Sequence, residues 1–213
     1  MEGQCYPHEY QSILRGSDSP AIHANIPLEK LYDQLCAGVF LNNRTVKYSV
    51  EKESQKNCFM MYARGFSIAC SDDPSCWKWV TEKDAPSNGV LVEMAELLKV
   101  CELDARRRKF DVSILSRATT YEVVFVIMLT PSGYGWENLV NFGVTLPDGT
   151  TQEHKVNLQK KPNGEWIEIK AGEVSTSEYT EGEMEVFMFE HGDHWKSGLV
   201  LKGVLIRPEQ INK

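Results

Sequence analysis

The feature that most constrains the fold is a period of two in hydrophobicity, repeated in short runs along most of the chain. Successive side chains of a β-strand point to opposite faces, so such runs are typical of half-buried strands. Turn signals such as Pro147-Asp148-Gly149-Thr150 separate the runs. The pattern predicts an all-β domain built as an antiparallel sandwich or barrel. The runs are 45–50, 58–62, 77–80, 90–94, 121–129, 140–146, 154–158, 166–170, 183–190 and 199–207.

A helical pattern precedes the strands. Pro27 suits a first helical turn and Gly38 an end, and four apolar residues between them share one face, namely Leu28, Leu31, Tyr32 and Leu35. A short helix is therefore predicted over 27–37. Residues 1–24 are polar and have few apolar anchors, so we expect a flexible tail. The chain then divides into this tail, a helix with leading strands at 25–65, and a main β-sandwich domain at 66–213, with 25–213 forming one compact unit.

Charge and hydropathy exclude several classes of protein. The 213 residues include 23 basic and 30 acidic side chains, a net charge of -7, so a dedicated nucleic-acid binder is not expected. The longest apolar run, Val123 to Leu129, is far shorter than the roughly 20 residues of a membrane-spanning helix. The first five residues contain no basic stretch followed by an apolar one, which predicts a cytoplasmic protein without a secretory signal.

One basic run, Arg106-Arg107-Arg108-Lys109, interrupts this acidic chain. It has two interpretations, a phosphate-binding or nuclear-targeting patch and a solvated turn between two strands. The acidic composition favours the turn.

Motifs of enzymes are absent from the sequence, since no P-loop, dinucleotide fingerprint, G-x-S-x-G or H-E-x-x-H pattern occurs. His191 and His194 resemble half of a metal site without a further ligand at a recognisable spacing. We therefore expect no catalytic residues, metal or cofactor.

The six cysteines form no C-x-x-C pair and are expected to be free thiols. The alternative is oxidation that links chains, for which Cys5 is the first candidate.

Trp77 and Trp79 are two residues apart, so on a strand their indoles face the same side. They either form a platform on which a flat sugar face stacks or fill the core. Acidic partners for a sugar are available in a later strand, at Glu183, Glu185 and Glu190. Since Glu183 and Glu190 are an odd number of positions apart, they share a ligand only if the strand bends.

Several motifs occur in an order that resembles the phloem protein 2 and Nictaba family of plant lectins. They are Ile68-Ala69-Cys70-Ser71-Asp72-Asp73-Pro74-Ser75-Cys76-Trp77-Lys78-Trp79, Val92-Glu93-Met94-Ala95-Glu96-Leu97-Leu98, Trp166-Ile167-Glu168-Ile169 with Gly172-Glu173, and His194-Trp195-Lys196-Ser197-Gly198-Leu199 leading to Arg207-Pro208. The helix and Asn57-Cys58-Phe59-Met60-Met61-Tyr62-Ala63-Arg64-Gly65 resemble the longer phloem lectins.

The resemblance implies a jelly-roll-like β-sandwich that binds N-acetylglucosamine oligomers, forms a homodimer and acts in sieve elements with a filament-forming phloem protein. It also implies sugar contacts at Trp77, Glu183 and Glu190. Cys70 and Glu102 stand where the family has tryptophan.

We therefore expect a non-enzymatic lectin for chito-oligosaccharides or N-glycan cores. The candidate site residues are Trp77, Trp79, Glu183, Glu190, Asp72 and Lys196. The alternatives are a structural phloem protein cross-linked through cysteines, with weak or lost sugar binding, and an RNA-carrying phloem protein.

Overall fold

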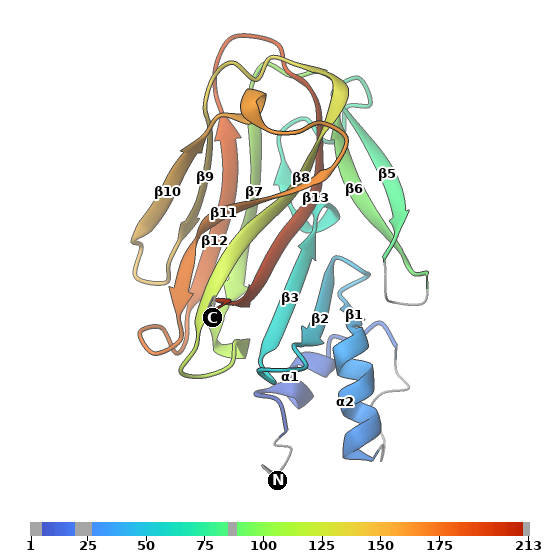
Figure 1. Cartoon of the computed structure of the whole chain (residues 1–213), viewed down its shortest axis with the longest axis vertical. Helices are drawn as coiled ribbons and strands as arrows, with labels where there is room; N and C mark the ends of the chain where they lie inside the picture. Colours follow the sequence, from blue (N-terminus) through green and yellow to red (C-terminus); the bar gives the residue numbers. More distant parts are fainter. Residues whose placement is uncertain (1–5, 20–26, 85–88, 211–213) are drawn as a thin grey trace.

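The computed structural model describes residues 6–19, 27–84 and 89–210, and these residues form two antiparallel β-sheets (Figure 1). Side chains alternate between buried and partly exposed along the strands, as in β2 (Val46–Val50). The predicted fold class, an antiparallel β-sandwich of jelly-roll type with a short N-terminal helix, is confirmed.

The larger sheet has eight strands arranged around β13 (Ser197–Pro208). One edge of β13 pairs with β3 and then with β6, and the other edge pairs with β8. The remaining strands extend the sheet outward from β3, β6 and β8. Besides β13 and β2, the strands of this sheet are β1 (Val39–Leu41), β3 (Asn57–Tyr62), β5 (Trp77–Lys83), β6 (Leu91–Leu97), β8 (Thr120–Tyr134) and β11 (Trp166–Ser175).

The smaller sheet has five strands in the order β10, β9, β12, β7 and β4. Their bounds are β4 (Ser67–Ile68), β7 (Leu103–Asp111), β9 (Val140–Thr145), β10 (Thr151–Val156) and β12 (Glu183–Glu190). Short 3-10 turns at η2 (Ala63–Gly65), η3 (Val112–Ile114) and η4 (Leu158–Lys160) lie between strands.

The core lies between the two sheets, where aromatic rings from opposite layers meet edge to face. Phe125 of β8 and Phe142 of β9 have ring centroids 5.3 Å apart, and Phe59 of β3 and Phe110 of β7 have centroids 5.4 Å apart. Such pairs add about 0.5–1.5 kcal/mol each to the free energy gained by apolar burial. The leading strands and the main domain thus share one core.

The predicted helix is present as α2 (Leu28–Ala37). Leu31, Tyr32 and Leu35 are buried on its inner face, as the spacing predicts. The helix ends at Gly38, whose φ of 95° is accessible to glycine and strained for other residues.

The prediction of a flexible tail is wrong for residues 6–19. This segment forms α1 (Tyr10–Leu14), whose Ile13 and Leu14 side chains are buried in the core. The carbonyl of His8 also accepts a hydrogen bond of 2.8 Å from the Asn57 side chain. Two apolar side chains and a few polar contacts therefore anchor a segment whose overall composition is polar. Residues 1–5 and 20–24 lie outside the described residues.

Each alternating run of the sequence overlaps a strand, but the two short strands β1 and β4 and the long strand β7 were not predicted. The basic run Arg106 to Lys109 is inside this strand, so its interpretation as a turn is wrong. Across β12, Met184 pairs with Phe110 and Val186 with Arg107, which leaves one extra residue on β7. The bulge places Lys109 at a positive φ of 64°. It also interrupts the period of two, which is why the strand was not recognised.

Candidate functional site

Four segments meet at the end of the sandwich that is uppermost in Figure 1, and we call this region the loop end. They are residues 69–76, 98–102, 135–139 and 191–196. Backbone hydrogen bonds join three of them: Val100 and Lys196 exchange bonds of 3.1 and 2.8 Å, and Leu98 donates to the Cys76 carbonyl at 2.8 Å. The last strand residue of β12, Glu190, enters the loop end from below.

A buried ion pair lies beneath these loops. Lys196 is fully buried, and its ammonium contacts the Glu190 carboxylate, which is 6% exposed. The ammonium also donates hydrogen bonds to the carbonyl of Cys101 and, at 3.1 Å, to that of His194. The other Glu190 oxygen accepts from the Gly192 N–H at 2.8 Å and from the Asn138 amide at 3.3 Å. The pair therefore links three of the four segments.

The environment of Glu190 decides its charge. Burial acts to raise the pKa of Glu190, but the hydrogen bond and charge of Lys196, together with Asn138 and the Gly192 N–H, outweigh burial and lower the pKa. The carboxylate therefore stays ionised at neutral pH. Gly192 is needed here, because a Cβ atom at that position would lie 2.5 Å from the Glu190 oxygen.

His194 completes the polar framework. Its Nε2 lies 3.0 Å from the Gly135 carbonyl, and its Nδ1 lies 3.3 Å from the Asn138 amide nitrogen. A carbonyl only accepts hydrogen bonds, so Nε2 carries the proton and Nδ1 accepts from Asn138. The imidazole is thereby occupied on both sides by other parts of the loop end.

Trp195 is the exposed aromatic side chain of this framework. Its side chain is 52% exposed, and the Lys99 ammonium lies 4.5 Å from the ring centroid. The sequence analysis quoted Trp195 within a family motif but did not select it as a site residue. The sequence signal that could have indicated its exposure is its position in a polar loop. A tryptophan that follows Gly192 and Asp193 has fewer apolar neighbours than one inside a strand.

Trp77 is not the exposed platform that we predicted. It is 2% exposed and belongs to the core, and its Nε1 donates a hydrogen bond of 2.9 Å to the Ala69 carbonyl. Trp79 lies on the same face of β5, as the spacing predicts, and packs partly against the core. The Arg64 guanidinium covers its ring at 3.7 Å from the centroid.

Glu183 and Glu190 lie at opposite ends of β12, because Glu183 pairs with Asp111 and Glu190 with Leu103 at the two ends of β7. At about 3.3 Å per residue, seven steps separate them by about 23 Å. They therefore do not contact one monosaccharide. Glu183 is exposed, and Asp72 is exposed in the 69–76 segment. Of the predicted site residues, the structure brings Glu190 and Lys196 into contact and leaves Asp72 at the same end.

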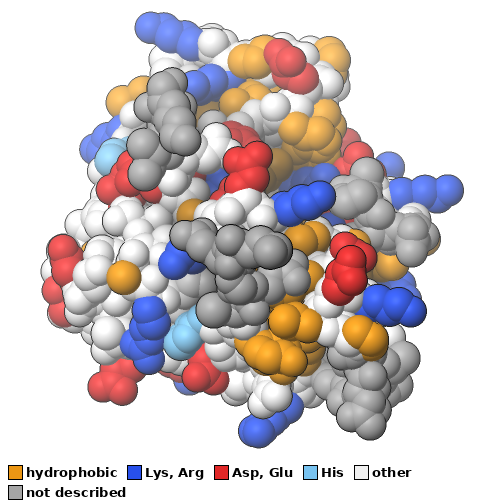
Figure 2. Space-filling model, turned by 60° about the horizontal axis from the view of Figure 1, so that its bottom comes forward, with side chains coloured by type: hydrophobic (Ala, Val, Ile, Leu, Met, Phe, Trp, Pro, Cys, Tyr) orange, Lys and Arg blue, Asp and Glu red, His pale blue; other side chains and the backbone are white. Residues whose placement is uncertain are grey.

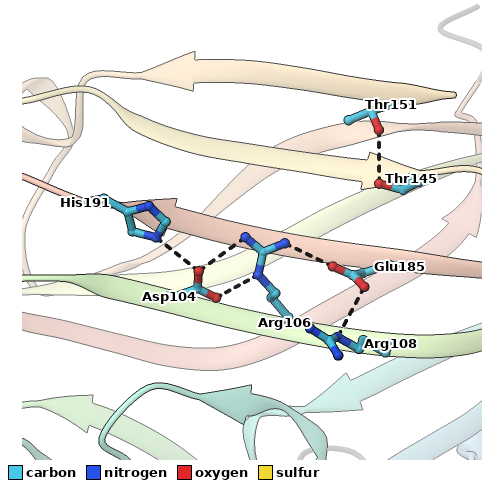
Figure 3. A network of polar contacts seen from close by, with 7 residues as sticks. All are labelled: Asp104, Arg106, Arg108, Thr145, Thr151, Glu185 and His191. Carbon is cyan, nitrogen blue, oxygen red and sulfur yellow. Dashed lines mark hydrogen bonds and ion pairs between the residues drawn. The ribbon is translucent and has the colours of Figure 1, made fainter. Parts of the chain in front are cut away.

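Side chains of the basic run form an ion-pair network on the outer surface of the smaller sheet (Figure 3). The Arg106 guanidinium contacts Asp104 at 2.8 Å and Glu185 at 3.1 Å, and Arg108 contacts Glu185 at 3.4 Å. His191 Nε2 lies 3.0 Å from the same Asp104 carboxylate. Two of the four cations are thus neutralised by acidic neighbours.

The cysteines of the described segments, at positions 36, 58, 70, 76 and 101, are free thiols, and Cys70 is exposed. Burial raises the pKa of Cys58 to about 12. Cys5 lies outside the described residues. In the described part of the chain, no group of three or more potential metal ligands occurs. None of the helices of residues 6–19, 27–84 and 89–210 has the length and hydrophobicity to cross a membrane.

A family model described as phloem protein 2 matches residues 56–208. The chain belongs to the phloem protein 2 family. It is 41% identical over 208 residues to Protein PHLOEM PROTEIN 2-LIKE A1 of Arabidopsis thaliana, covering 96% of this chain and 82% of that protein. It is 40% identical over 205 residues to a protein named Lectin of Luffa acutangula, covering 95% of both. Among solved structures, a CBM27-1 module from Caldicellulosiruptor saccharolyticus in complex with mannohexaose matches with 11% identity and a TM-score of 0.42, covering 70% of this chain and 92% of that chain.

Proposed function

We propose that this protein is a non-enzymatic lectin of the phloem cytoplasm that binds N-acetylglucosamine oligomers or N-glycan cores at the loop end. The observation that carries the proposal is an exposed indole, Trp195, on loops that a buried ion pair holds together. The proposal is supported by the Luffa acutangula relative named Lectin.

The indole of Trp195 supplies the apolar part of binding. If a sugar ring covers about a third of an indole of roughly 200 Å², about 60 Å² leaves water, and at about 25 cal/mol/Å² this contributes roughly 1.5 kcal/mol. Exposed Asp72 and Asp193, on the 69–76 and 191–196 segments, are available as acceptors for sugar hydroxyls.

Glu190 and Lys196 act as positioning residues in this proposal. Both side chains are buried and their polar atoms are occupied by each other and by loop groups. Trp77 likewise positions the 69–76 segment through its bond to the Ala69 carbonyl. The loops are therefore held before the sugar arrives, which lowers the entropic cost of binding.

A single exposed indole gives weak affinity for one sugar. Two such sites in a homodimer recover affinity on a polymeric ligand, because the second contact forms at high effective concentration. We therefore propose a homodimer that binds chitin-type polymers or multivalent glycoproteins more tightly than short oligomers.

Calorimetric titration with chitotriose tests the site. Trp195→Ala should weaken binding about tenfold, which corresponds to about 1.4 kcal/mol. Tyr6→Ala is the matched control, because Tyr6 is 59% exposed and belongs to the N-terminal segment. Unchanged affinity of Trp195→Ala would remove the loop end as the sugar site. If the wild-type protein does not bind chitotriose at all, the proposed function itself is overturned.

The ion pairs of the basic run argue against RNA binding. A phosphate-binding patch needs free cations, whereas Arg106 and Arg108 contact carboxylates. On the face seen in Figure 2, acidic and basic side chains are interspersed. RNA binding is therefore not proposed.

A structural role through thiols is a second candidate function. The observation that favours it is the exposed thiol of Cys70, at the loop end. We propose that oxidation joins chains, or a chain and a filament-forming phloem protein, through Cys70 or Cys5. Non-reducing electrophoresis after peroxide treatment should show covalent multimers that diminish in Cys70→Ser or Cys5→Ser. A wild type that stays monomeric would contradict this role.

A further inference from the structure

A hollow of about 590 Å³ lies where separate parts of the chain meet, outside the loop end. The N-terminal segment contributes Asp18, the turn between β1 and β2 contributes Asn43 and Arg44, and η2 contributes Arg64. The hairpin of β5 and β6 forms the remaining wall. Trp77, Trp79 and Thr81 lie on the same face of β5, because they are two residues apart. Along this face the side chains change from the buried Trp77 through the partly buried Trp79 to Thr81, which lines the hollow.

The turn at the hollow has an uncommon backbone. Asn42, Asn43 and Arg44 have φ values of 54°, 55° and 62°, in the left-handed region that residues with a Cβ atom seldom adopt. The Asp18 carboxylate holds this turn by accepting the N–H groups of Asn43 at 2.8 Å and Arg44 at 2.7 Å. Backbone held in this region by its surroundings is concentrated at ligand sites. The N-terminal segment thus fixes the turn that presents the Asn43 and Arg44 side chains.

Arg64 and Glu93 belong to the lining of the hollow, and Arg64 also stacks on Trp79. The Arg64 guanidinium lies 3.7 Å from the Trp79 ring centroid and makes two hydrogen bonds to the Glu93 carboxylate, of 2.9 and 2.6 Å. Hydrogen bonding to Arg64 lowers the pKa of Glu93, so both groups are charged at neutral pH. Leu91, 48% exposed, adds an apolar surface next to this stack. The wall therefore offers planar polar groups beside an aliphatic side chain.

The charges of the hollow select the kind of ligand. Asp18 and Glu93 carry two negative charges, and Arg44 and Arg64 carry two positive charges, so the lining is neutral overall. Within the described chain, the Arg44 guanidinium makes no hydrogen bond or ion pair, and it is free to donate to a ligand. A neutral lining with fixed donors, fixed acceptors and one aliphatic side chain fits hydroxyl and acetamido groups better than phosphate or sulfate groups.

We propose that this hollow is a second binding site of the same chain, for a neutral oligosaccharide that carries N-acetyl groups. The class of ligand rests on the proposed function, whereas the site is separate from the loop end. One protomer then holds two glycan sites, and a multivalent glycan can be bound without a partner chain.

Equilibrium dialysis of the full chain against radiolabelled chitotriose tests the proposal by counting sites. The wild type should bind two chitotriose molecules per chain. Arg44→Ala should bind one, with the affinity of the hollow reduced at least tenfold. Lys109→Ala is the matched control, because Lys109 is also an exposed cation at a positive φ and does not line the hollow. It should bind two.

The outcomes separate this inference from the proposed function. One site per wild-type chain, unaffected by Arg44→Ala and weakened by Trp195→Ala, would overturn the second site and leave the lectin function in place. One site that Arg44→Ala removes and Trp195→Ala does not would support the hollow and overturn the loop end. If the wild-type protein does not bind chitotriose, both the second site and the lectin function are overturned.

Discussion

The tryptophans of β5 and the tryptophan of the 191–196 loop show how differently one residue type is used in two regions. Trp77 is 2% exposed and belongs to the core from an edge strand, and Trp195 is 52% exposed on a loop. The two regions are held by different kinds of contact. β5 is fixed by pairing along β6, and the loop is fixed by the buried contact of Glu190 with Lys196.

In the proposed function, the sugar platform therefore lies on a loop and not on a strand face. A strand of this sandwich buries whichever face turns to the opposite sheet, so a tryptophan there contributes to stability first. A loop tryptophan becomes a binding group only when polar contacts hold the loop, because an unheld loop would lose conformational entropy on binding.

The largest expected effect is on the buried indole. Trp77→Ala should lower the free energy of unfolding by about 3–5 kcal/mol, because it leaves a cavity in the core and removes the hydrogen bond to the Ala69 carbonyl. Urea denaturation measures this change. Trp195→Ala is the control and should change the free energy of unfolding by less than about 0.5 kcal/mol. Equal losses of unfolding free energy in Trp77→Ala and Trp195→Ala would show that the two indoles contribute equally to stability, which contradicts the account.

The second effect concerns the ion pair that holds the loop. Glu190→Gln should destabilise the protein by about 3 kcal/mol at pH 7, because Lys196 remains buried without a counter-charge. The folded-state pKa of Glu190 is lowered from 4.5, so its stabilising contribution is present above that pH and is lost as the pH falls through the folded-state pKa.

Urea denaturation between pH 7 and pH 3 measures that dependence. Stability of the wild type should fall on acidification more steeply than stability of Glu190→Gln. Glu183→Gln, at the exposed end of the same strand, is the matched control and should follow the wild type. Parallel curves for all three proteins would show that the pair does not hold the loop.

A smaller effect is expected from enlarging the platform. Cys70 is exposed, so Cys70→Trp adds an indole to the loop end without filling a packed space. Calorimetry should show chitotriose affinity up to about tenfold tighter, or about 1.4 kcal/mol. A loss of stability in thermal unfolding, with no gain in affinity, would show that the segment 69–76 has repacked around the thiol.

Much of the fold followed from the sequence because period-two alternation determines strands directly. The strands from β8 to β13 were predictable for that reason, and the helix at 28–37 was predictable from the helical spacing of its apolar residues. β7 was missed because a bulge interrupts the period and because four consecutive cations are unexpected in a strand. Ion pairs with Asp104 and Glu185 accommodate two of these cations, Arg106 and Arg108. α1 was missed because two buried apolar residues are a weak signal in a polar segment.

The candidate site was less predictable because its residues come from separate loops. The spacing of Glu183 and Glu190 indicated opposite faces, but it did not show that one carboxylate would be buried against Lys196. The spacing of Trp77 and Trp79 gave their common face correctly, whereas the side of the sheet that faces the core depends on how the sheets pack. Exposure of Trp195 likewise depends on contacts between distant segments.

The central claim is that the sugar stacks on Trp195, and the most direct measurement is the shift of the tryptophan indole N–H resonances during titration of 15N-labelled protein with chitotriose. The Trp195 indole should shift in a saturable manner. The indoles of Trp77 and Trp136, buried and bonded to the carbonyls of Ala69 and Ser197, should stay in place. A saturable shift of the Trp77 resonance with none at Trp195 would contradict the account.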